Sequence, residues 1–319
     1  MNASQPRWPP EVEELVADQA EWWHRTVRSL GICSADLIGR LGRLLESCDE
    51  RGDELIRDDA SGAIVGVASY STNSWTGLRE GYLYALGPLS RPDMAVRSVT
   101  TWARRRTAET GIRLWRAEVV SGVPRAVASI LEGSGWLRHY DVTVIRLPKA
   151  TDVGVPDGLV VREAAEEDWP FVANLLFEAV WNSLFQVERV ARTRASVRRV
   201  VRNEYHEGLR TGSTFSFVAT GVDGRRLGHA TGRVLDRHAV LGLVEGELVD
   251  TSTLASAQGQ GLGWALSAAA LRELSARGAE VCFGTVELIH TPKERLPAIR
   301  HHLALHGWQT FSTFWLLVP

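Results

Sequence analysis

Three glycines stand at alternate positions, Gly259, Gly261 and Gly263, directly before an apolar, alanine-rich segment with the pattern of a helix. Glycine costs roughly 1 kcal/mol against alanine inside a helix, so this cluster indicates a requirement of the backbone rather than a helix preference. The first turn of a helix presents unpaired N–H groups and the positive end of the helix dipole, and glycines let an anion approach them. The spacing therefore predicts a binding site for a phosphate or pyrophosphate.

Two common phosphate-binding loops do not match this stretch. A P-loop needs Gly-Lys-Ser/Thr at the start of its helix, and that sequence does not follow the glycines. A dinucleotide-binding loop needs the spacing G-x-G-x-x-G in the first unit of a parallel sheet. Here the glycines follow a predicted hairpin over 215–235 and a further predicted strand over 241–254. Both the spacing and the context therefore differ from those of a dinucleotide-binding loop.

The elements that would carry this loop occur twice along the chain. Each half ends with a predicted strand, a helix, a Gly-Trp turn and a closing strand, over 114–147 in the first half and 280–318 in the second. Two copies of about 150 residues indicate a duplicated domain rather than a solenoid. The segment 148–158 holds two prolines and two glycines, which predicts a linker. We therefore expect two domains, 1–150 and 151–319.

Strands followed by single crossover helices predict the fold class. We expect an α/β (α+β) protein of two similar lobes, each a mixed, mostly antiparallel sheet flanked by helices. In each half, a longer amphipathic helix ends at a glycine that is a candidate C-cap, Gly111 in the first half and Gly278 in the second.

The glycine stretch resembles the motif Gln/Arg-x-x-Gly-x-Gly/Ala of the GNAT acyltransferase superfamily, with Gln258, Gly261 and Gly263 at the motif positions. The flanks agree with this resemblance. The segment 159–169 looks like the family's opening strand and helix, and the His-Gly-Trp sequence at 306–308 stands where the family commonly has Leu-Gly-Phe. The resemblance covers 159–319 and rests on the order of the elements as well as on the glycines.

This resemblance implies that acyl-CoA or acetyl-CoA is the co-substrate, without a metal. The pantetheine arm would bind like an added strand beside Thr251, Ser252 and Thr253, where the family's central strand diverges from its neighbour. The pyrophosphate would lie over a seven-residue loop, Gln258, Gly259, Gln260, Gly261, Leu262, Gly263 and Trp264.

The first half has the same order of elements but lacks the loop. Its corresponding segment, 88–96, contains Pro88 and Pro92, which have no N–H to donate, and no pair of glycines. We therefore expect a degenerate N-terminal lobe and a catalytic C-terminal lobe that alone binds pyrophosphate.

Acyl transfer to an amine needs a base that takes a proton from the amine. In GNAT enzymes a glutamate on the central strand often has this role. Glu245 and Glu247 lie two residues apart and so on one face of the predicted strand, with Asp250 expected on the other face. Glu247 is the first choice for the base and Glu245 the second. The alternative for either residue is an ordinary solvated or ion-paired carboxylate.

The family's usual acid is a tyrosine four residues before the glycine of Leu-Gly-Phe, and this position is Leu303 here. His302 is the nearest residue that could replace it, although an exposed histidine on a helix is more often without a catalytic role. Three other histidines remain candidates on composition or position alone, His206, His229 and His290.

The resemblance implies an N-acyltransferase that acts on the amine of a small molecule held between the lobes, such as an aminosugar-containing antibiotic or another secondary metabolite. The segment 180–205 carries Trp181, Phe185 and several arginines and could bind an anionic or glycosylated acceptor, although arginines on an amphipathic helix mostly form a solvated face. Three alternatives remain open. They are a mycothiol-synthase-like acetyltransferase, an enzyme that acetylates proteins or peptides, and an acyl-CoA-binding sensor without turnover.

Composition gives little support to other classes of function. The net charge is −2, from 36 basic and 38 acidic residues, which argues against nucleic acid or an anionic membrane as a partner. The three cysteines, Cys33, Cys48 and Cys282, lack metal-ligand spacing. The sequence shows neither a secretion signal nor an apolar run of 18 residues, so we expect a cytoplasmic protein. It is expected to be a monomer or a homodimer.

Overall fold

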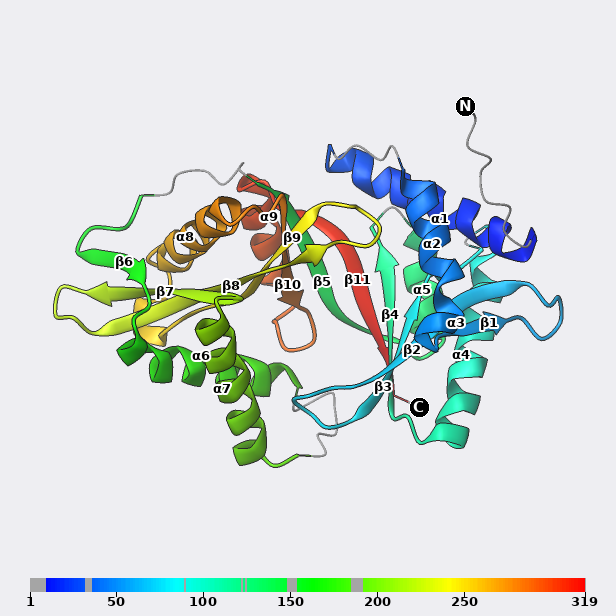
Figure 1. The fold of residues 1–319 in the computed structure, drawn as a ribbon, viewed down its shortest axis with the longest axis horizontal. Helices are drawn as coiled ribbons and strands as arrows, with labels where there is room; N and C mark the ends of the chain where they lie inside the picture. The colour runs from blue at the N-terminus through cyan, green and yellow to red at the C-terminus, as the bar shows by residue number, and fades with distance from the viewer. Residues whose placement is uncertain are drawn as a thin grey trace.

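The strands of both halves join in one continuous sheet (Figure 1). A computed structural model describes residues 10–31, 36–88, 90–121, 123, 125–147, 154–184 and 192–318. The strands are β1 (Glu54–Arg57), β2 (Ile64–Thr72), β3 (Arg79–Tyr84), β4 (Leu114–Val120), β5 (Leu137–Arg146), β6 (Leu159–Glu163), β7 (Thr214–Gly221), β8 (Arg226–Arg237), β9 (Val244–Thr253), β10 (Val281–Glu287) and β11 (Gln309–Leu317). Their order in the sheet is β1-β2-β3-β4-β11-β5-β10-β9-β8-β7-β6.

Helices cover both faces of this sheet. They are α1 (Pro10–Ser29), α2 (Leu37–Glu46), α3 (Cys48–Arg51), α4 (Pro92–Thr110), α5 (Arg125–Gly133), α6 (Trp169–Leu184), α7 (Arg194–Thr211), α8 (Leu262–Ala276) and α9 (Leu296–Leu305). In the second half, Gly246 of β9 faces α8, whereas Val249 packs against the apolar cluster of α6 and α7. The central strand β9 therefore lies between α8 on one side and α6 with α7 on the other.

The two halves exchange their closing strands. β5, from the first half, pairs with β10, and β11, from the second half, pairs with β4. The two exchanged strands also pair with each other, and they cross the middle of the molecule in green and red in Figure 1. The sheet of each half is thus completed by a strand of the other half.

The predicted fold class, a mixed and mostly antiparallel sheet flanked by helices, is confirmed. The parallel neighbours are β3 with β4 and β9 with β10, and the other neighbours in the sheet run antiparallel. The boundary near residue 150 stays a prediction. The predicted linker lies partly outside the described residues, since 148–153 are not among them.

The parallel strand pairs show the internal repeat residue by residue. Glu80 pairs with Leu114 in the first half, and Glu245 pairs with Val281 in the second. This register aligns the sequence EGYLY of β3 with EGELV of β9. It also places Arg116 of β4 at the position of Phe283 of β10. The two halves therefore have the same local frame but different side chains at its centre.

Asp168 fixes the start of α6 to the sheet. Its buried carboxylate accepts hydrogen bonds from Arg162 at 2.6 Å, from Arg226 at 2.5 Å and from the backbone N–H of Ala165 at 2.9 Å. Burial alone would raise the pKa of Asp168, but these donors outweigh it and lower the pKa to about 2.

Replacing Asp168 with asparagine is expected to lower the free energy of unfolding by roughly 2 kcal/mol at pH 7. The folded-state pKa lies below the ordinary value of 3.8, so the charge stabilises the fold above pH 4 and this contribution is lost as the pH falls toward 2. Urea unfolding of the wild type and the variant from pH 7 to pH 3 measures the effect. The control is Asp59→Asn, whose exposed ion pair with Arg105 is expected to contribute less than about 1 kcal/mol. An Asp168 effect that does not decrease toward pH 3 would contradict the prediction.

Candidate active site

The glycine loop begins α8 as the sequence predicts, and two of its glycines are required by the backbone. Gly259 and Gly261 have φ angles of 77° and 76°, in the left-handed region, and Gly261 is the N-cap of the helix. Gly263 has a different role, because a Cβ there would stand 3.9 Å from Thr251 Cγ2 and 4.0 Å from Thr253 Cγ2. Its missing side chain keeps free space between the first turn of α8 and β9.

The start of α8 is open to solvent. Gly259, Gln260 and Gly261 are all exposed. The first hydrogen bonds within the helix run from the N–H groups of Trp264 and Ala265 to the carbonyl of Gly261. The N–H groups before them belong to the first turn, which has no carbonyl of its own helix to bond. The loop therefore has the exposure and the polarity of an anion site.

A channel opens where β9 and β10 diverge. The two strands are paired from Glu245–Val281 to Glu247–Phe283 and separate beyond that point. The gap holds a cavity of about 240 Å³. Residues of β5, β9, α8, β10 and α9 line it, together with the residue directly before β11. They are Thr143, Leu248, Val249, Asp250, Thr251, Ser267, Gly284, Thr285, Val286, Leu303 and Trp308. The channel thus passes between the strands from the side of α8.

A β-bulge corrects the expected orientation of Asp250. The register between β8 and β9 shifts between Thr231 and Gly232, so that Val249 has no partner in the ladder. A bulge places two successive residues on one side of a strand. Asp250 therefore lies on the same face as Glu247, where both line one cavity, and not on the opposite face.

Asp250 is held by neighbours on that face. The hydroxyl of Ser252 donates to its Oδ2 atom at 2.7 Å. Nε2 of the fully buried His229 lies 3.0 Å from the same oxygen. The other ring nitrogen of His229, Nδ1, lies 3.0 Å from the hydroxyl oxygen of Thr231. The sequence-predicted candidate His229 thus lies behind Asp250 rather than at the cavity surface.

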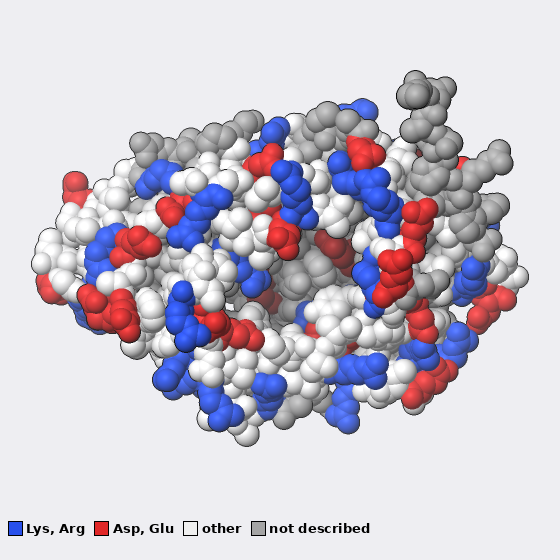
Figure 2. All heavy atoms as spheres, in the orientation of Figure 1, with Lys and Arg blue, Asp and Glu red and all other residues white. Residues whose placement is uncertain are grey.

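An inter-lobe cavity of about 440 Å³ lies between the two halves. The second half lines it with α6, α7 and the strands β7, β8, β9 and β10. The first half lines it with β3, β4, β5 and the β2–β3 connection. Its carboxylates are Glu204, Glu247, Asp250 and Glu287, which outnumber its two guanidinium groups, those of Arg116 and Arg233. Figure 2 shows the molecule hollowed between the halves, with acidic side chains in and around the hollow. The cavity therefore favours a ligand with positive charge.

The channel and the inter-lobe cavity meet at three residues. Val249, Asp250 and Thr285 line both spaces. A third cavity of about 350 Å³, called the third space below, lies next to the channel and the inter-lobe cavity and shares Glu247 with the latter. Thr285 lines all three. The structure therefore brings the divergence of β9 and β10 together with both predicted strand carboxylates, since Glu245 also lines the third space.

The two candidate glutamates have different environments. Glu247 forms an ion pair with Arg233, its partner across the β8–β9 ladder. Glu245 lies deeper, and burial, with the charge of Glu247 next, raises its pKa to about 7. In the first half the corresponding carboxylate, Glu80, forms a buried ion pair with Arg116 at 3.0 Å. The second half has Phe283 at the arginine position, and this substitution leaves Glu245 without that cation.

His302 lies beside the glycine loop and not among the residues that line the channel. Its ring meets Trp264 edge-on, with 5.8 Å between the centroids, and His306 stacks on the same indole at 3.8 Å. Leu303, the next residue of α9, lines the channel. The position at which the resemblance places an acid thus does face the channel, but with an aliphatic side chain.

Several residues of the inter-lobe cavity were missed by sequence analysis because they come from the first half. They include Tyr82, Arg116 and His139. Nη1 of Arg116 and Nδ1 of His139 lie 3.2 Å apart, and burial, then the charge of Arg116, lowers the pKa of His139 to about 3. His139 is therefore neutral at physiological pH. The repeated Glu-Gly sequence at 80–81 was the one local signal for this site.

Two other sequence-predicted features lie away from the cavity. Arg194 and Arg198 of α7 form ion pairs with Glu178 and lie over the ring of Phe177. They are exposed and do not line the inter-lobe cavity, which agrees with the solvated-face alternative for these arginines rather than with an acceptor contact. Phe185 and Cys33 lie outside the described residues.

The remaining histidines are also placed. His206 packs against Trp169, with 5.5 Å between the ring centroids. His290 follows β10, and its Nδ1 atom lies 3.3 Å from an oxygen of Glu287.

No group of three or more candidate metal ligands occurs among the described residues. The described helices include none with the length and hydropathy to span a membrane.

Comparison with solved structures identifies the fold. No family model matches the sequence, and no curated protein matches it either. A GCN5-related N-acetyltransferase from Sphaerobacter thermophilus is similar with a TM-score of 0.54 and 14% identity, over 97% of this chain and 93% of that one. One from Kribbella flavida has a TM-score of 0.49 and 13% identity, over 89% and 95%. A tandem GNAT protein from the clavulanic acid biosynthesis pathway has a TM-score of 0.48 and 16% identity, over 96% and 95%.

The first of these similarities extends over nearly the whole of both chains. The chain therefore has the fold of a GCN5-related N-acetyltransferase, which confirms the fold implied by the sequence resemblance. The match includes both halves, so the fold is the two-lobed form.

Proposed function

We propose that this protein is an acyl-CoA-dependent N-acyltransferase that acts on the amine of a small molecule. The observation that carries the proposal is the junction at Val249, Asp250 and Thr285, where the channel between β9 and β10 meets the inter-lobe cavity. A thioester in the channel would face an amine in the cavity at this point. Reactant groups held in such an arrangement gain much of the entropic advantage of an intramolecular reaction.

The second half is proposed to bind acyl-CoA or acetyl-CoA. The residues 258–264 would hold the pyrophosphate, since the left-handed turn at Gly259 and Gly261 exposes the start of α8. The backbone of 251–253 would hold the pantetheine arm beside the channel, where Thr251 Oγ1 already lies 3.1 Å from Ser267 Oγ of α8. The proposal thus gives the two domains different roles. Residues 151–319 bind the acyl-CoA, and residues 1–150 supply one wall of the acceptor cavity.

The acceptor is proposed to be a cationic, hydroxyl-bearing amine such as an aminosugar. Glu204 accepts a hydrogen bond from the indole of Trp75 at 2.5 Å, and Glu287 accepts from the backbone N–H groups of residues 289 and 290. With Asp250, these carboxylates line the cavity, and the donors in the hydrogen bonds described for them are uncharged groups. An ammonium group would add the missing opposite charge, and hydroxyl groups would add hydrogen bonds.

We propose that the two glutamates of β9 have different roles, one in orienting the acceptor and one as the general base. Glu247, already ion-paired with Arg233, orients the acceptor's ammonium group. Glu245, with a pKa of about 7, takes the proton through a water molecule. The amine nitrogen then forms its bond to the acyl carbon, and the carbon–sulfur bond breaks as CoA leaves. Because Leu303 faces the channel, α9 supplies no proton to the leaving thiolate, and His302 has no step in this scheme.

The test is amine-dependent release of the CoA thiol. The full-length protein with acetyl-CoA, and in parallel with longer acyl-CoAs, is mixed with monoamines, diamines and aminosugars. We expect release of thiol only in the presence of an amine, greatest for aminosugars, with the acylated amine visible by mass spectrometry. CoA binding without amine-dependent release would overturn the proposal in favour of an acyl-CoA sensor. Release only with peptides would replace the small-molecule acceptor.

A further inference from the structure

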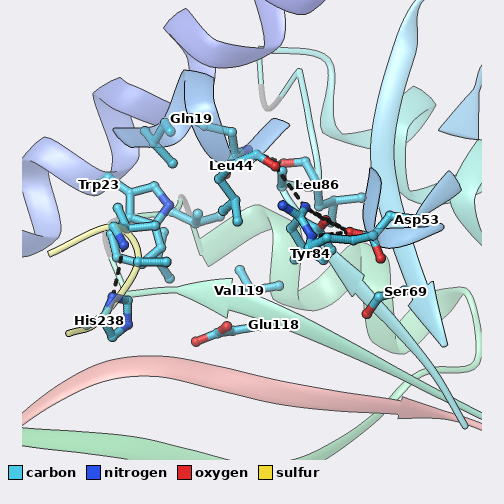
Figure 3. A pocket seen from close by; sticks show the side chains of 17 residues that line it. Gln19, Trp23, Leu44, Asp53, Ser69, Tyr84, Leu86, Glu118, Val119 and His238 are labelled. Atoms are coloured by element: carbon cyan, nitrogen blue, oxygen red, sulfur yellow. Dashed lines mark hydrogen bonds and ion pairs between the residues drawn. The ribbon is translucent and has the colours of Figure 1, made fainter. Parts of the chain in front are cut away.

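A second cavity, the first-half pocket, has a volume of about 550 Å³ and lies on the first-half side of the third space, with which it shares Glu118 and His238 (Figure 3). α1, α2, β3 and β4 form its walls, and the tip of the β8–β9 connection, 238–240, reaches in from the other half. Its apolar lining is Trp23, Leu41, Leu44, Ala85, Leu86, Val119, Val120, Val123, Ala239 and Val240. An apolar cavity of this size with a few polar groups has the properties of a small-molecule site.

The internal repeat shows that this pocket does not serve a second acyl-CoA. β3 and β4 are paired up to Leu83 and Ala117 and then diverge, as β9 and β10 do. The backbone beyond β3 is already bonded, because the side-chain amide of Gln19 on α1 donates to the carbonyl of Leu86 at 2.7 Å. A pantetheine arm would need this edge free. The pocket therefore has room for a ligand of another class.

Glu118 places a carboxyl group at the floor of the pocket. Figure 3 shows its carboxyl group below the apolar residues, on β4. The hydroxyl of Ser312 on the exchanged strand β11 donates to one of its oxygens at 2.6 Å. Burial raises the pKa of Glu118. In the repeat, Glu118 occupies the position of Thr285, so the carboxyl group is particular to the first half. A buried carboxylate is costly unless a cation pairs with it.

The other polar side chains of the pocket do not supply that cation. Arg51 bonds the carboxylate of Asp53 at 2.8 Å and the hydroxyl of Tyr84 at 2.7 Å. Nδ1 of His238 accepts from the backbone N–H groups of residues 240 and 241, both at 3.2 Å. Burial, then the charge of Arg40, lowers the pKa of His238 to about 4, so this ring is neutral at physiological pH.

We infer that the first-half pocket binds a hydrophobic primary amine, with its ammonium group on Glu118 and its apolar body against Trp23, Leu44 and Val119. This inference does not depend on acyl transfer in the second half. The positive charge of such a ligand matches the carboxyl group at the floor of the pocket, and its apolar body matches the apolar walls. The ligand can be added or withheld in experiments without acyl-CoA.

The experiment measures binding of n-octylamine and of n-octanol to the full-length protein, by calorimetry and by thermal unfolding, at pH 7.5. We expect the amine to bind and to raise the melting temperature by a few degrees at saturation, following the usual linkage between binding and stability. The alcohol, which has the same chain without the charge, should bind at least about tenfold more weakly.

Three variants locate the amine. Glu118→Gln and the cavity-filling Leu44→Trp should each weaken amine binding at least about tenfold, whereas Glu204→Gln, in the inter-lobe cavity and outside the third space, should leave it unchanged. Melting curves without ligand show that each variant is folded. Loss of binding in Glu204→Gln alone would place the amine in the inter-lobe cavity and overturn the inference. Equal binding of octanol and octylamine, or no binding of either, would also overturn it.

Discussion

Replacing Glu245 with glutamine is expected to lower kcat/KM for amine acylation by about 100- to 1,000-fold at pH 8, the usual contribution of a general base. The wild-type rate should rise between pH 6 and pH 8, because a carboxyl group with a pKa of about 7 is mostly protonated below this range and mostly charged above it. The variant, which has no titrating group at this position, should show a much flatter profile. Thiol release across this pH range, with one acyl-CoA and one amine, measures both effects.

A stability measurement separates this catalytic loss from unfolding. The folded-state pKa of Glu245 lies above the ordinary value of 4.5, so ionisation of this carboxyl group destabilises the fold as the pH rises from 4.5 through 7. Glu245→Gln should therefore unfold at a higher temperature than the wild type at pH 8 and at the same temperature near pH 4.5. A variant that is inactive and also less stable at pH 8 would contradict the assignment.

Glu247→Gln is the matched comparison, two residues along the same strand face. It should raise KM for the amine more than it lowers kcat, because Glu247 is proposed to orient the ammonium group. Its rate should still rise with pH, but at a lower pH than in the wild type, because the charge of Glu247 raises the pKa of Glu245. The reverse result, with a flat profile for Glu247→Gln and a normal one for Glu245→Gln, would make Glu247 the base.

Replacing Gly261 with aspartate is expected to weaken CoA binding by about 100-fold or more, since it places a negative charge at the helix end proposed to bind the pyrophosphate. Aspartate is a favourable N-cap residue and tolerates left-handed φ angles better than most side chains, so α8 should still form. Calorimetric titration with CoA measures the change.

Two controls separate the charge from the backbone. Gly261→Asn has nearly the same shape without the charge and should bind CoA far better than Gly261→Asp. Gly278→Asn changes a glycine of positive φ at the other end of α8, where a Cβ would meet no atom within 4 Å, and should leave CoA binding unchanged. Wild-type affinity in Gly261→Asp would show that the nucleotide lies elsewhere.

The glycine loop could be predicted from the sequence because its determinants are local. The left-handed turn at Gly259 and Gly261 and the apolar face of the helix after them depend on neighbouring residues. The common face of Glu245 and Glu247 follows from the two-residue period of a strand. These features needed no knowledge of distant parts of the chain.

Other features of the site depend on distant partners and could not be predicted. The bulge that turns Asp250 toward Glu247 is set by the register against β8, so the period-two rule was wrong there. The pKa of Glu245 depends on the absence of an arginine that the first half has at Arg116. The apolar patterns of β5 and β11 are alike, and each predicts a closing strand without saying which half it completes.

The exchanged strands have a consequence for how the chain is made. The hydrogen bond between Ser312 and Glu118 joins residues 194 positions apart, and β11 must reach β4 before that edge is covered. At about 5 to 20 residues per second, a ribosome needs roughly 10 to 40 s to synthesise the intervening segment. During this time the nascent first half carries an open strand edge, a known template for aggregation. Chaperone protection of this translation intermediate should therefore determine the yield of native protein.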